Sequence, residues 1–221
     1  ELKMNFIALA AHELRTPAAV IHGVVETIER RGGQLEDGQK ADLEQMLSAQ
    51  AAGLKGLVEQ LLDLSRLDAH AVPIEPSRIP VRERVEEIVS LAAGSRAGEV
   101  DVQVPAKLEA LVDPDAFDRI ISNLVTNALR YGRAPVSVTA ERENGRLTVA
   151  VEDRGEGVPS EFVPKLFERF SRSDPSRRRA GGTGLGLAIA HSYAEALAGE
   201  LRYRDARPHG ACFELVLPSA T

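Results

Sequence analysis

The stretch that decides the fold lies close to the start of the chain and reads Phe6-Ile7-Ala8-Leu9-Ala10-Ala11-His12-Glu13-Leu14-Arg15-Thr16-Pro17. Apolar side chains recur through and beyond it at alternating steps of four and three residues: Ile7, Ala11, Leu14, Ala18, Ile21, Val25 and Ile28. This spacing is typical of the core stripe of a packed helix, and it predicts one amphipathic helix over residues 1–31. His12 falls one position off the stripe, so we expect it at the solvent-facing edge of the helix.

His12 is the candidate nucleophile of this helix. Thr16 follows one turn later on the same face, and Glu13 lies within reach of the same solvent pocket. Pro17 removes a backbone N–H and leaves the Glu13 carbonyl without its helical partner, which predicts a kink just past the histidine. A single histidine in a helix is more often a structural residue, so this interpretation depends on the rest of the chain.

A second helix is predicted after a glycine-rich turn at residues 30–38. Its seam again alternates steps of four and three residues: Leu43, Leu47, Gln50, Leu54, Leu57, Leu61 and Leu64. The resulting hairpin cannot cover two long apolar seams alone, whereas two copies would form a four-helix bundle. We therefore expect a homodimer. The alternative, packing of the hairpin on its own chain, is weaker because the later residues predict a self-contained fold.

Three prolines between residues 73 and 80 predict a linker or edge segment, which we take as the domain boundary. Helical patterns follow at residues 81–93, 116–131 and 184–198, and strand patterns at 99–104, 110–112, 136–141, 147–151, 200–204 and 211–217. Asn144-Gly145 predicts a hairpin turn. The predicted fold class is α+β, with a helical hairpin over residues 1–71, a linker over 72–80 and an α/β sandwich over 81–221.

Composition and charge exclude some classes of function and predict the cellular compartment. The 221 residues carry 27 basic and 33 acidic side chains, and a net charge of −6 argues against binding to nucleic acid. No apolar run approaches the roughly 20 residues that cross a bilayer, so we expect no membrane contact from this fragment. The chain opens at Glu1 inside a helical pattern, and we expect a longer protein whose membrane anchor, if any, lies upstream. The single Cys212 predicts core packing in a reducing, cytoplasmic compartment.

Two asparagines lie four residues apart in the stretch from Ser122 to Tyr131, so Asn123 and Asn127 project from one helix face. Their amide oxygens suit a hard, hydrated cation such as Mg²⁺ that bridges phosphates. Paired asparagines are disfavoured inside helices, which makes a purely structural role the weaker alternative.

Two glycine-containing stretches predict close approach of the backbone to a ligand. Asp153 follows a strand and begins Asp153-Arg154-Gly155-Glu156-Gly157, where a carboxylate can accept a hydrogen bond from an amino group such as that of adenine. The alternative is an ordinary Asp-rich turn. The second stretch, Gly181-Gly182-Thr183-Gly184-Leu185-Gly186-Leu187, precedes a helix whose N-terminus predicts a phosphate site.

The segment between these glycines contains Phe167-Glu168-Arg169-Phe170 and five arginines from Arg169 to Arg179, Arg172 among them. Glycines at both ends predict a hinged lid whose arginines close over phosphate oxygens. The plain alternative is a solvated loop, and both interpretations hold if the loop orders on nucleotide binding.

The segment His-Glu-Leu-Arg-Thr-Pro resembles the phospho-acceptor motif of sensor histidine kinases. The four stretches described above, which contain the paired asparagines, Asp153, Phe167–Phe170 and Gly181–Leu187, resemble that family's N, G1, F and G2 boxes in the expected order. The resemblance covers nearly the whole chain. Its ATP domain would belong to the superfamily that includes gyrase and the ninety-kilodalton heat-shock chaperone.

The resemblance implies a protein-histidine kinase with ATP and Mg²⁺ as ligands. His12 would be phosphorylated, with Glu13 as its general base and Thr16 positioning water for dephosphorylation of a partner. Asn127 and Asn123 would hold Mg²⁺, and Asp153 would bind the adenine amino group. The remaining nucleotide-binding residues would be Arg130, Tyr131, Gly155, Gly157, Phe170, Arg172, Gly182, Thr183, Gly184, Leu185, Gly186 and Leu187. The partner would be a response-regulator receiver domain.

The sequence departs from the family at two points. Arg130 stands where lysine is usual, which changes the geometry near the phosphates. Leu197-Ala198-Gly199 replaces a His-Gly-Gly, which we expect to affect only a turn. Two other functions stay open: a phosphatase of the phosphorylated partner that depends on Thr16, and a nucleotide-gated dimer that hydrolyses ATP without phosphohistidine.

Overall fold

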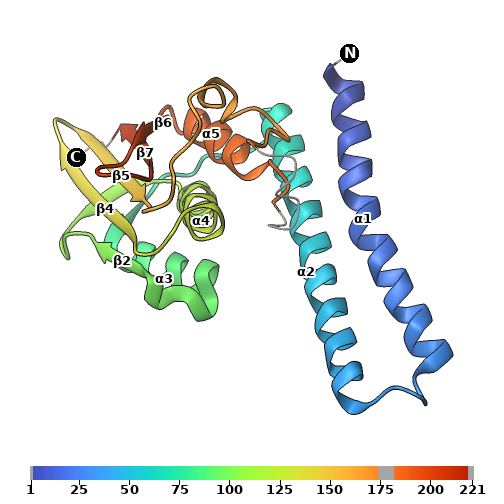
Figure 1. Ribbon diagram of the computed structural model, residues 1–221. Helices are drawn as coiled ribbons and strands as arrows, with labels where there is room; N and C mark the ends of the chain where they lie inside the picture. Colours follow the sequence, from blue (N-terminus) through green and yellow to red (C-terminus); the bar gives the residue numbers. More distant parts are fainter. Residues whose placement is uncertain (1, 174–181, 219–221) are drawn as a thin grey trace. The chain divides into compact units, whose positions relative to one another are not determined.

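The computed structural model describes residues 2–173 and 182–218, and the chain divides into two compact units, residues 1–65 and 66–221. The first unit is a helical hairpin of α1 (Leu2–Arg31) and most of α2 (Asp37–Asp68), drawn in blue and cyan in Figure 1. Helix α1 runs unbroken through Pro17. Among the described residues, no helix combines the length and the hydropathy that a membrane span requires.

The hairpin buries only part of its apolar surface. Leu57 and Leu64 of the predicted α2 seam are buried, but Val25 of the predicted α1 stripe is 39% exposed. Further large apolar side chains are exposed on the same two helices: Leu9, Met46, Val58 and Leu62. The exposed apolar surface is what a hairpin leaves when its second seam has no cover within its own unit.

The second unit is built on a five-stranded sheet in the order β2-β4-β5-β7-β6. Its strands are β2 (Val100–Gln103), β4 (Val136–Glu143), β5 (Arg146–Glu152), β6 (Glu200–Asp205) and β7 (Ala211–Pro218). Strands β2 and β4 are parallel, and all other pairs are antiparallel. Helices α3 (Val81–Ala93), α4 (Pro114–Tyr131) and α5 (Gly186–Ala196) form a layer against the sheet (Figure 1), which confirms the predicted α+β fold class.

Alternation along the strands explains the layering. Val136, Val138 and Ala140 of β4 are buried, as are Leu147, Val149 and Val151 of β5, while the residues between them are more exposed. The two strands meet at Asn144 and Gly145, whose φ angles of 52° and 72° are the positive values that a two-residue hairpin turn requires. The hairpin prediction is confirmed.

The end of the predicted linker is not irregular. Residues 77–80 form β1 (Ser77–Pro80), which pairs antiparallel with β3 (Glu109–Val112) and buries Ile79. Pro80 is tolerated because it is the last residue of a strand in a two-stranded sheet, where its missing N–H breaks no interior ladder. The described part of this unit also contains two short 3₁₀ helices, η1 (Gly94–Glu99) and η2 (Val163–Lys165).

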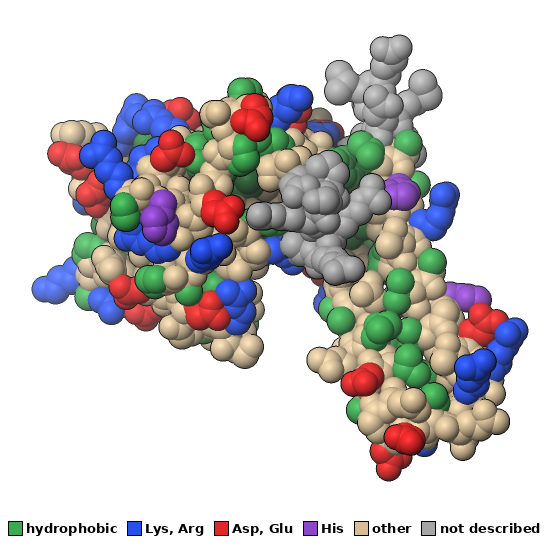
Figure 2. Space-filling view, in the orientation of Figure 1, with side chains coloured by type: hydrophobic (Ala, Val, Ile, Leu, Met, Phe, Trp, Pro, Cys, Tyr) green, Lys and Arg blue, Asp and Glu red, His purple; other side chains and the backbone are tan. Residues whose placement is uncertain are grey.

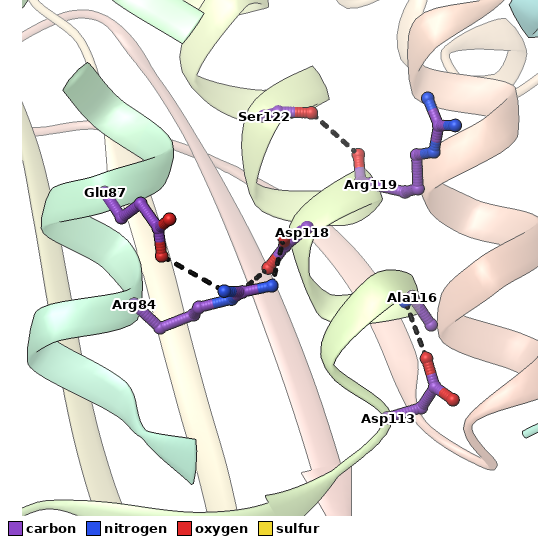
Figure 3. Close-up of polar contacts among 7 residues, drawn as sticks. All are labelled: Arg84, Glu87, Asp113, Ala116, Asp118, Arg119 and Ser122. Atoms are coloured by element: carbon purple, nitrogen blue, oxygen red, sulfur yellow. Dashed lines mark hydrogen bonds and ion pairs between the residues drawn. The ribbon is translucent and has the colours of Figure 1, made fainter. Parts of the chain in front are cut away.

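Asp113 caps α4 and also holds the linker. Its Oδ1 accepts from the Ala116 N–H at 2.8 Å, and its Oδ2 accepts from the Glu75 N–H at 2.8 Å. Figure 3 shows the capping bond at the start of the helix. Asp113 is 7% exposed, so its bond to Ala116 is buried and its bond to Glu75 is partly buried. One carboxylate therefore satisfies an orphan helix donor and fixes the chain entering the second unit.

An ion pair joins α3 to α4. Arg84 donates from Nε and Nη2 to the two Asp118 oxygens at 2.7 and 2.6 Å, and its Nη1 reaches Glu87 at 3.0 Å (Figure 3). The hydrogen bond to Asp118 raises the pKa of Arg84 above its ordinary value. This fork-to-fork pair fixes the orientation of α4 relative to α3.

Candidate nucleotide site

The candidate site begins on the polar face of α4. The opposite face of this helix is buried through Phe117, Ile120, Ile121, Leu124, Val125 and Ala128. Because those positions are fixed in the core, Asn123 and Asn127 must lie on the remaining face, where both are half-buried. The predicted i, i+4 placement is what the structure has.

The two asparagines differ in their bonding. Asn123 Nδ2 donates to the Arg119 carbonyl at 2.7 Å, so its Oδ1 is turned outward as an acceptor, beside Gly186 at the start of α5. The Asn127 amide forms no hydrogen bond within residues 2–173 and 182–218. A half-buried amide without a protein partner indicates a group that bonds to solvent or ligand. The oxygens fit a hydrated Mg²⁺ carried by phosphates.

Asp153 follows directly on β5 and is only 4% exposed. Its Oδ1 accepts from the Gly155 N–H at 2.7 Å and, at 3.4 Å, from the Ala211 N–H. Burial raises the pKa of this carboxyl above its ordinary value. In the described part of the chain no group donates to Oδ2. The second oxygen is thus available to an amino group of a ligand.

Two glycines outside the predicted glycine stretches make room for Asp153. A Cβ built on Gly132, the residue after α4, would lie 2.5 Å from Asp153 Cβ and closer still to Cγ. Gly210 has φ +124°, and a Cβ there would collide with the Asp153 carbonyl oxygen. Gly132 follows Tyr131 in the sequence without any repeat or box to mark it, so only the close approach of α4 to the end of β5 reveals its role.

The second glycine stretch lies against α4. A Cβ on Gly182 would overlap the Tyr131 hydroxyl and lie 3.6 Å from Arg130 Nη1, and one on Gly186 would lie 2.9 Å from Asn123 Oδ1. Leu185 N–H donates to Thr183 Oγ1 at 3.2 Å, and the half-buried Leu187 lies in the first turn of α5. The structure therefore brings this stretch and the polar face of α4 together.

Helix α5 begins at Gly186, two residues later than the sequence predicted. Gly184 has φ +71°, a left-handed conformation that a right-handed helix excludes. The extra two residues belong to the loop, where Gly184 packs on Phe170 and Ser171.

Phe170, in the predicted lid segment, forms a backbone hydrogen bond with the loop that precedes α5. Its φ is +60°, uncommon for a bulky residue, and its N–H donates to the Gly184 carbonyl at 2.8 Å. Arg172 is half-buried close by in sequence, while Arg169 forms a two-pronged ion pair with Asp68 within residues 66–221. The predicted lid residues Arg177, Arg178 and Arg179, and Gly181, lie outside the described residues.

The candidate nucleophile belongs to the first unit. His12 is exposed on α1, and Thr16 Oγ1 donates to the His12 carbonyl at 3.3 Å. Glu13 is half-buried beside it. His12 is exposed as expected, but the described residues that α1 buries are Ala10 and Val24, whereas Ala11 and Ala18 of the predicted stripe are exposed. The exposure leaves the imidazole accessible to a reagent from solution.

Both halves of the chain match family models. Residues 2–70 match the His Kinase A (phospho-acceptor) domain, and residues 112–221 match the histidine kinase-, DNA gyrase B- and HSP90-like ATPase.

Two curated relatives illustrate the sequence similarity. The signal transduction histidine-protein kinase AfsQ2 of Streptomyces coelicolor is 32% identical over 224 residues, which cover 97% of this chain and 41% of that protein. The sensor protein kinase WalK of Staphylococcus saprophyticus is 32% identical over 226 residues, covering 98% of this chain and 36% of that protein. The chain thus spans about two fifths or less of the length of these relatives.

Solved structures share the fold. The histidine kinase AdeS of Acinetobacter baumannii superposes with a TM-score of 0.76 at 24% identity, covering 95% of this chain and 98% of that one. The histidine kinase ThkA in complex with the response regulator protein TrrA gives a TM-score of 0.72 at 21% identity, covering 98% of this chain and 61% of that one. At these identities the likeness shows the fold alone.

Proposed function

This chain belongs to the sensor histidine kinases of two-component signal transduction, and on that premise we propose that it transfers the γ-phosphoryl group of ATP to His12. The phosphoryl group then passes to an aspartate on the receiver domain of a response regulator. We further propose that the chemistry takes place in the cytoplasm, where the buried, unpaired thiol of Cys212 meets reducing conditions.

One observation carries the nucleotide-binding part of this proposal. A buried carboxylate, Asp153, keeps one oxygen without a donor within residues 2–173 and 182–218, and glycines surround it where side chains would fill the space. An amino group such as that of adenine fits this oxygen. The exposed phosphates would then extend toward Asn127 and the start of α5, whose free N–H groups favour anions.

Phosphoryl transfer follows from the chemistry of His12. A neutral imidazole nitrogen attacks the γ-phosphorus while the bond from that phosphorus to the β–γ bridging oxygen breaks, and ADP leaves. Glu13, the next residue, takes the proton that the imidazole nitrogen loses. Only the neutral imidazole is nucleophilic, because the protonated ring has no free lone pair on nitrogen.

Asn123 and Asn127 are the residues that would hold Mg²⁺ with the phosphates. The ion would neutralise charge on the transferring group. The chain's own contribution is orientation: the Arg119 carbonyl binds Asn123 Nδ2 and thereby turns the amide oxygen toward the phosphate side. Arg130, Tyr131 and the glycines at 182, 184 and 186 complete the proposed contacts.

We propose that the protein acts as a homodimer. The exposed side chains of Leu9, Val25, Met46, Val58 and Leu62 support this, because pairing two hairpins would cover them. The hairpin of His12 is also the proposed docking surface for the receiver domain, since that is where the phosphoryl group must be handed over. We propose residues 1–71 as the dimerisation and phosphotransfer domain, residues 72–80 as the linker and residues 81–221 as the ATP-binding domain.

We also propose that Thr16 takes part in dephosphorylation of the receiver domain. Its hydroxyl is exposed one turn from His12, where it can orient water. Replacing Thr16 by alanine should abolish this phosphatase activity and spare the labelling of His12.

Radiolabelling is the experiment that tests the proposed function. The chain is incubated with γ-labelled ATP and Mg²⁺, beside a His12→Gln variant and a His22→Gln control, since His22 is a second exposed histidine of α1. Label that survives base, is lost in acid and disappears only in His12→Gln supports the kinase. ATP hydrolysis without protein label would instead support the nucleotide-gated dimer.

A further inference from the structure

The turn between β6 and β7 packs against the loop that follows β5. Asp153 N–H donates to the Ala211 carbonyl at 3.0 Å, and Arg154 Nη1 donates to the Arg207 carbonyl at 2.5 Å. His209 Nδ1 lies 3.2 Å from the Gly155 carbonyl oxygen. The Arg154 N–H also donates to the Arg133 carbonyl at 3.0 Å, so the loop over residues 153–158 is held by the β6–β7 turn and by the segment after α4, not by its own secondary structure.

Tyr203, on β6, makes the bond that reaches furthest into this loop. Its hydroxyl accepts from the Val158 N–H at 3.2 Å and donates to Asp205 Oδ1 at 2.6 Å. Burial and the bond to Asp205 raise the pKa of Tyr203 to about 12, so the hydroxyl keeps its proton at neutral pH. Because that proton is committed to Asp205, the oxygen lone pairs face Val158.

The ring of Tyr203 is held separately from its hydroxyl. It packs on Phe213 of β7 with ring centroids 5.5 Å apart and planes at 55°. The ring therefore packs within the sheet, whereas the hydroxyl forms a hydrogen bond with the loop.

Val158 is a sensitive point of the loop. It follows Gly157, whose φ of +76° turns the chain and whose Cα faces the Gly210 carbonyl, with a Cβ position 3.1 Å from that oxygen. Without the Tyr203 bond, the Val158 N–H loses its partner, and the turn at Gly157 loses its anchor. The loop would then sample conformations in which Gly155 and Asp153 no longer lie together.

We propose that Tyr203 is a positioning residue of the nucleotide site, which holds the 153–158 loop in its binding conformation through the Val158 N–H. The inference rests on the proposed function, because the loop must bind nucleotide for its conformation to matter. Its effect is on affinity: a site that is only fractionally in its binding conformation binds more weakly by that fraction.

Binding of the non-hydrolysable analogue AMPPNP with Mg²⁺, measured by calorimetry on the whole chain, tests the proposal. Tyr203→Phe keeps the ring and removes the hydroxyl, and it should raise Kd about 3- to 10-fold, the range expected for one lost hydrogen bond. The rate of His12 labelling at saturating ATP should stay unchanged, while the KM for ATP rises with Kd. Asp205→Asn, which keeps an acceptor for the hydroxyl, should bind almost as wild type does.

Arg202→Gln is the matched control. Arg202 neighbours Tyr203 on β6, but it pairs with Glu200 and, among the described residues, makes no hydrogen bond or ion pair with the 153–158 loop, so Kd should not change. A Tyr203→Phe protein with a lower melting temperature and a wild-type Kd would overturn the proposal, since the hydroxyl would then serve only packing. Wild-type protein that fails to bind AMPPNP would refute the proposed function instead, and this measurement comes first.

Discussion

Substitution of Gly132 by alanine is a direct test of the site geometry. Gly132 has φ −85° and ψ −163°, an extended conformation that alanine adopts freely, so the change introduces no backbone strain. Its effect is purely steric. The new Cβ would lie 2.5 Å from Asp153 Cβ, closer still to Cγ, and 2.6 Å from the Ala128 carbonyl oxygen.

The size of the effect follows from these contacts. Non-bonded carbon atoms rest about 3.5–4.0 Å apart, so the Asp153 side chain must retreat by about 1 Å or more. Overpacking of this kind costs about 1–3 kcal/mol of folding stability. The retreat also removes the proposed hydrogen bond from the ligand amino group to the carboxylate, worth about 1.5–3 kcal/mol, or roughly a 10- to 100-fold rise in Kd for ATP.

Calorimetric titration with AMPPNP and a thermal melt measure the two consequences. Gly98→Ala is the control, because a Cβ on Gly98 would meet no atom within 4 Å. The control should bind and melt as wild type does. If Gly132→Ala binds AMPPNP with the wild-type Kd, then Asp153 either tolerates the displacement or does not contact the ligand, and our account of the site is wrong.

Two further substitutions separate stability from binding. Burial raises the pKa of Asp153 above its value in the unfolded chain. The free energy of unfolding therefore falls as pH rises through the folded pKa, because the buried carboxyl then becomes charged. Asp153→Asn should therefore weaken AMPPNP binding at least about tenfold without lowering the melting temperature at pH 7, and wild-type affinity should fall as pH drops through the raised pKa. Asp113→Ala should lower the free energy of unfolding by about 2–4 kcal/mol in urea, because α4 loses its cap and the Glu75 N–H its acceptor, whereas Asp115→Ala should change it by about 0.5 kcal/mol or less.

Most of the fold follows from local patterns in the sequence. Helix α3 has the predicted bounds, and the Asn144-Gly145 turn joins the predicted strands. These features were predictable because period and turn chemistry act over a few residues. The start of α5 was wrong by two residues because Gly184 adopts a left-handed conformation, which its sequence context permits but does not require.

The candidate site was predictable only where a motif marks it. Asn123, Asn127 and Asp153 stand in recognisable stretches, but Gly132 and Tyr203 do not. Gly132 matters because the end of α4 meets the end of β5, and Tyr203 because β6 lies beyond β7 in the sheet. Both depend on contacts between residues far apart in the chain, and a single sequence contains no local signal for them. The role of Asp113 in holding Glu75, 38 residues away, is of the same kind.

Helix α4 explains why these separate parts form one site. Its apolar face is fixed in the core, and the Arg84–Asp118 pair fixes its orientation relative to α3. Asp113 caps the start of α4 and also binds the Glu75 N–H. The middle of the helix carries Asn123, beside the start of α5, and Asn127. Gly132, directly after the helix, packs against Asp153. A shift of this one helix would therefore move Asp113, the proposed Mg²⁺-binding asparagines and the proposed adenine site at Asp153 together. Substitutions that loosen α4 should for that reason alter stability and nucleotide affinity jointly, whereas Tyr203→Phe should act on affinity through the 153–158 loop and leave α4 in place.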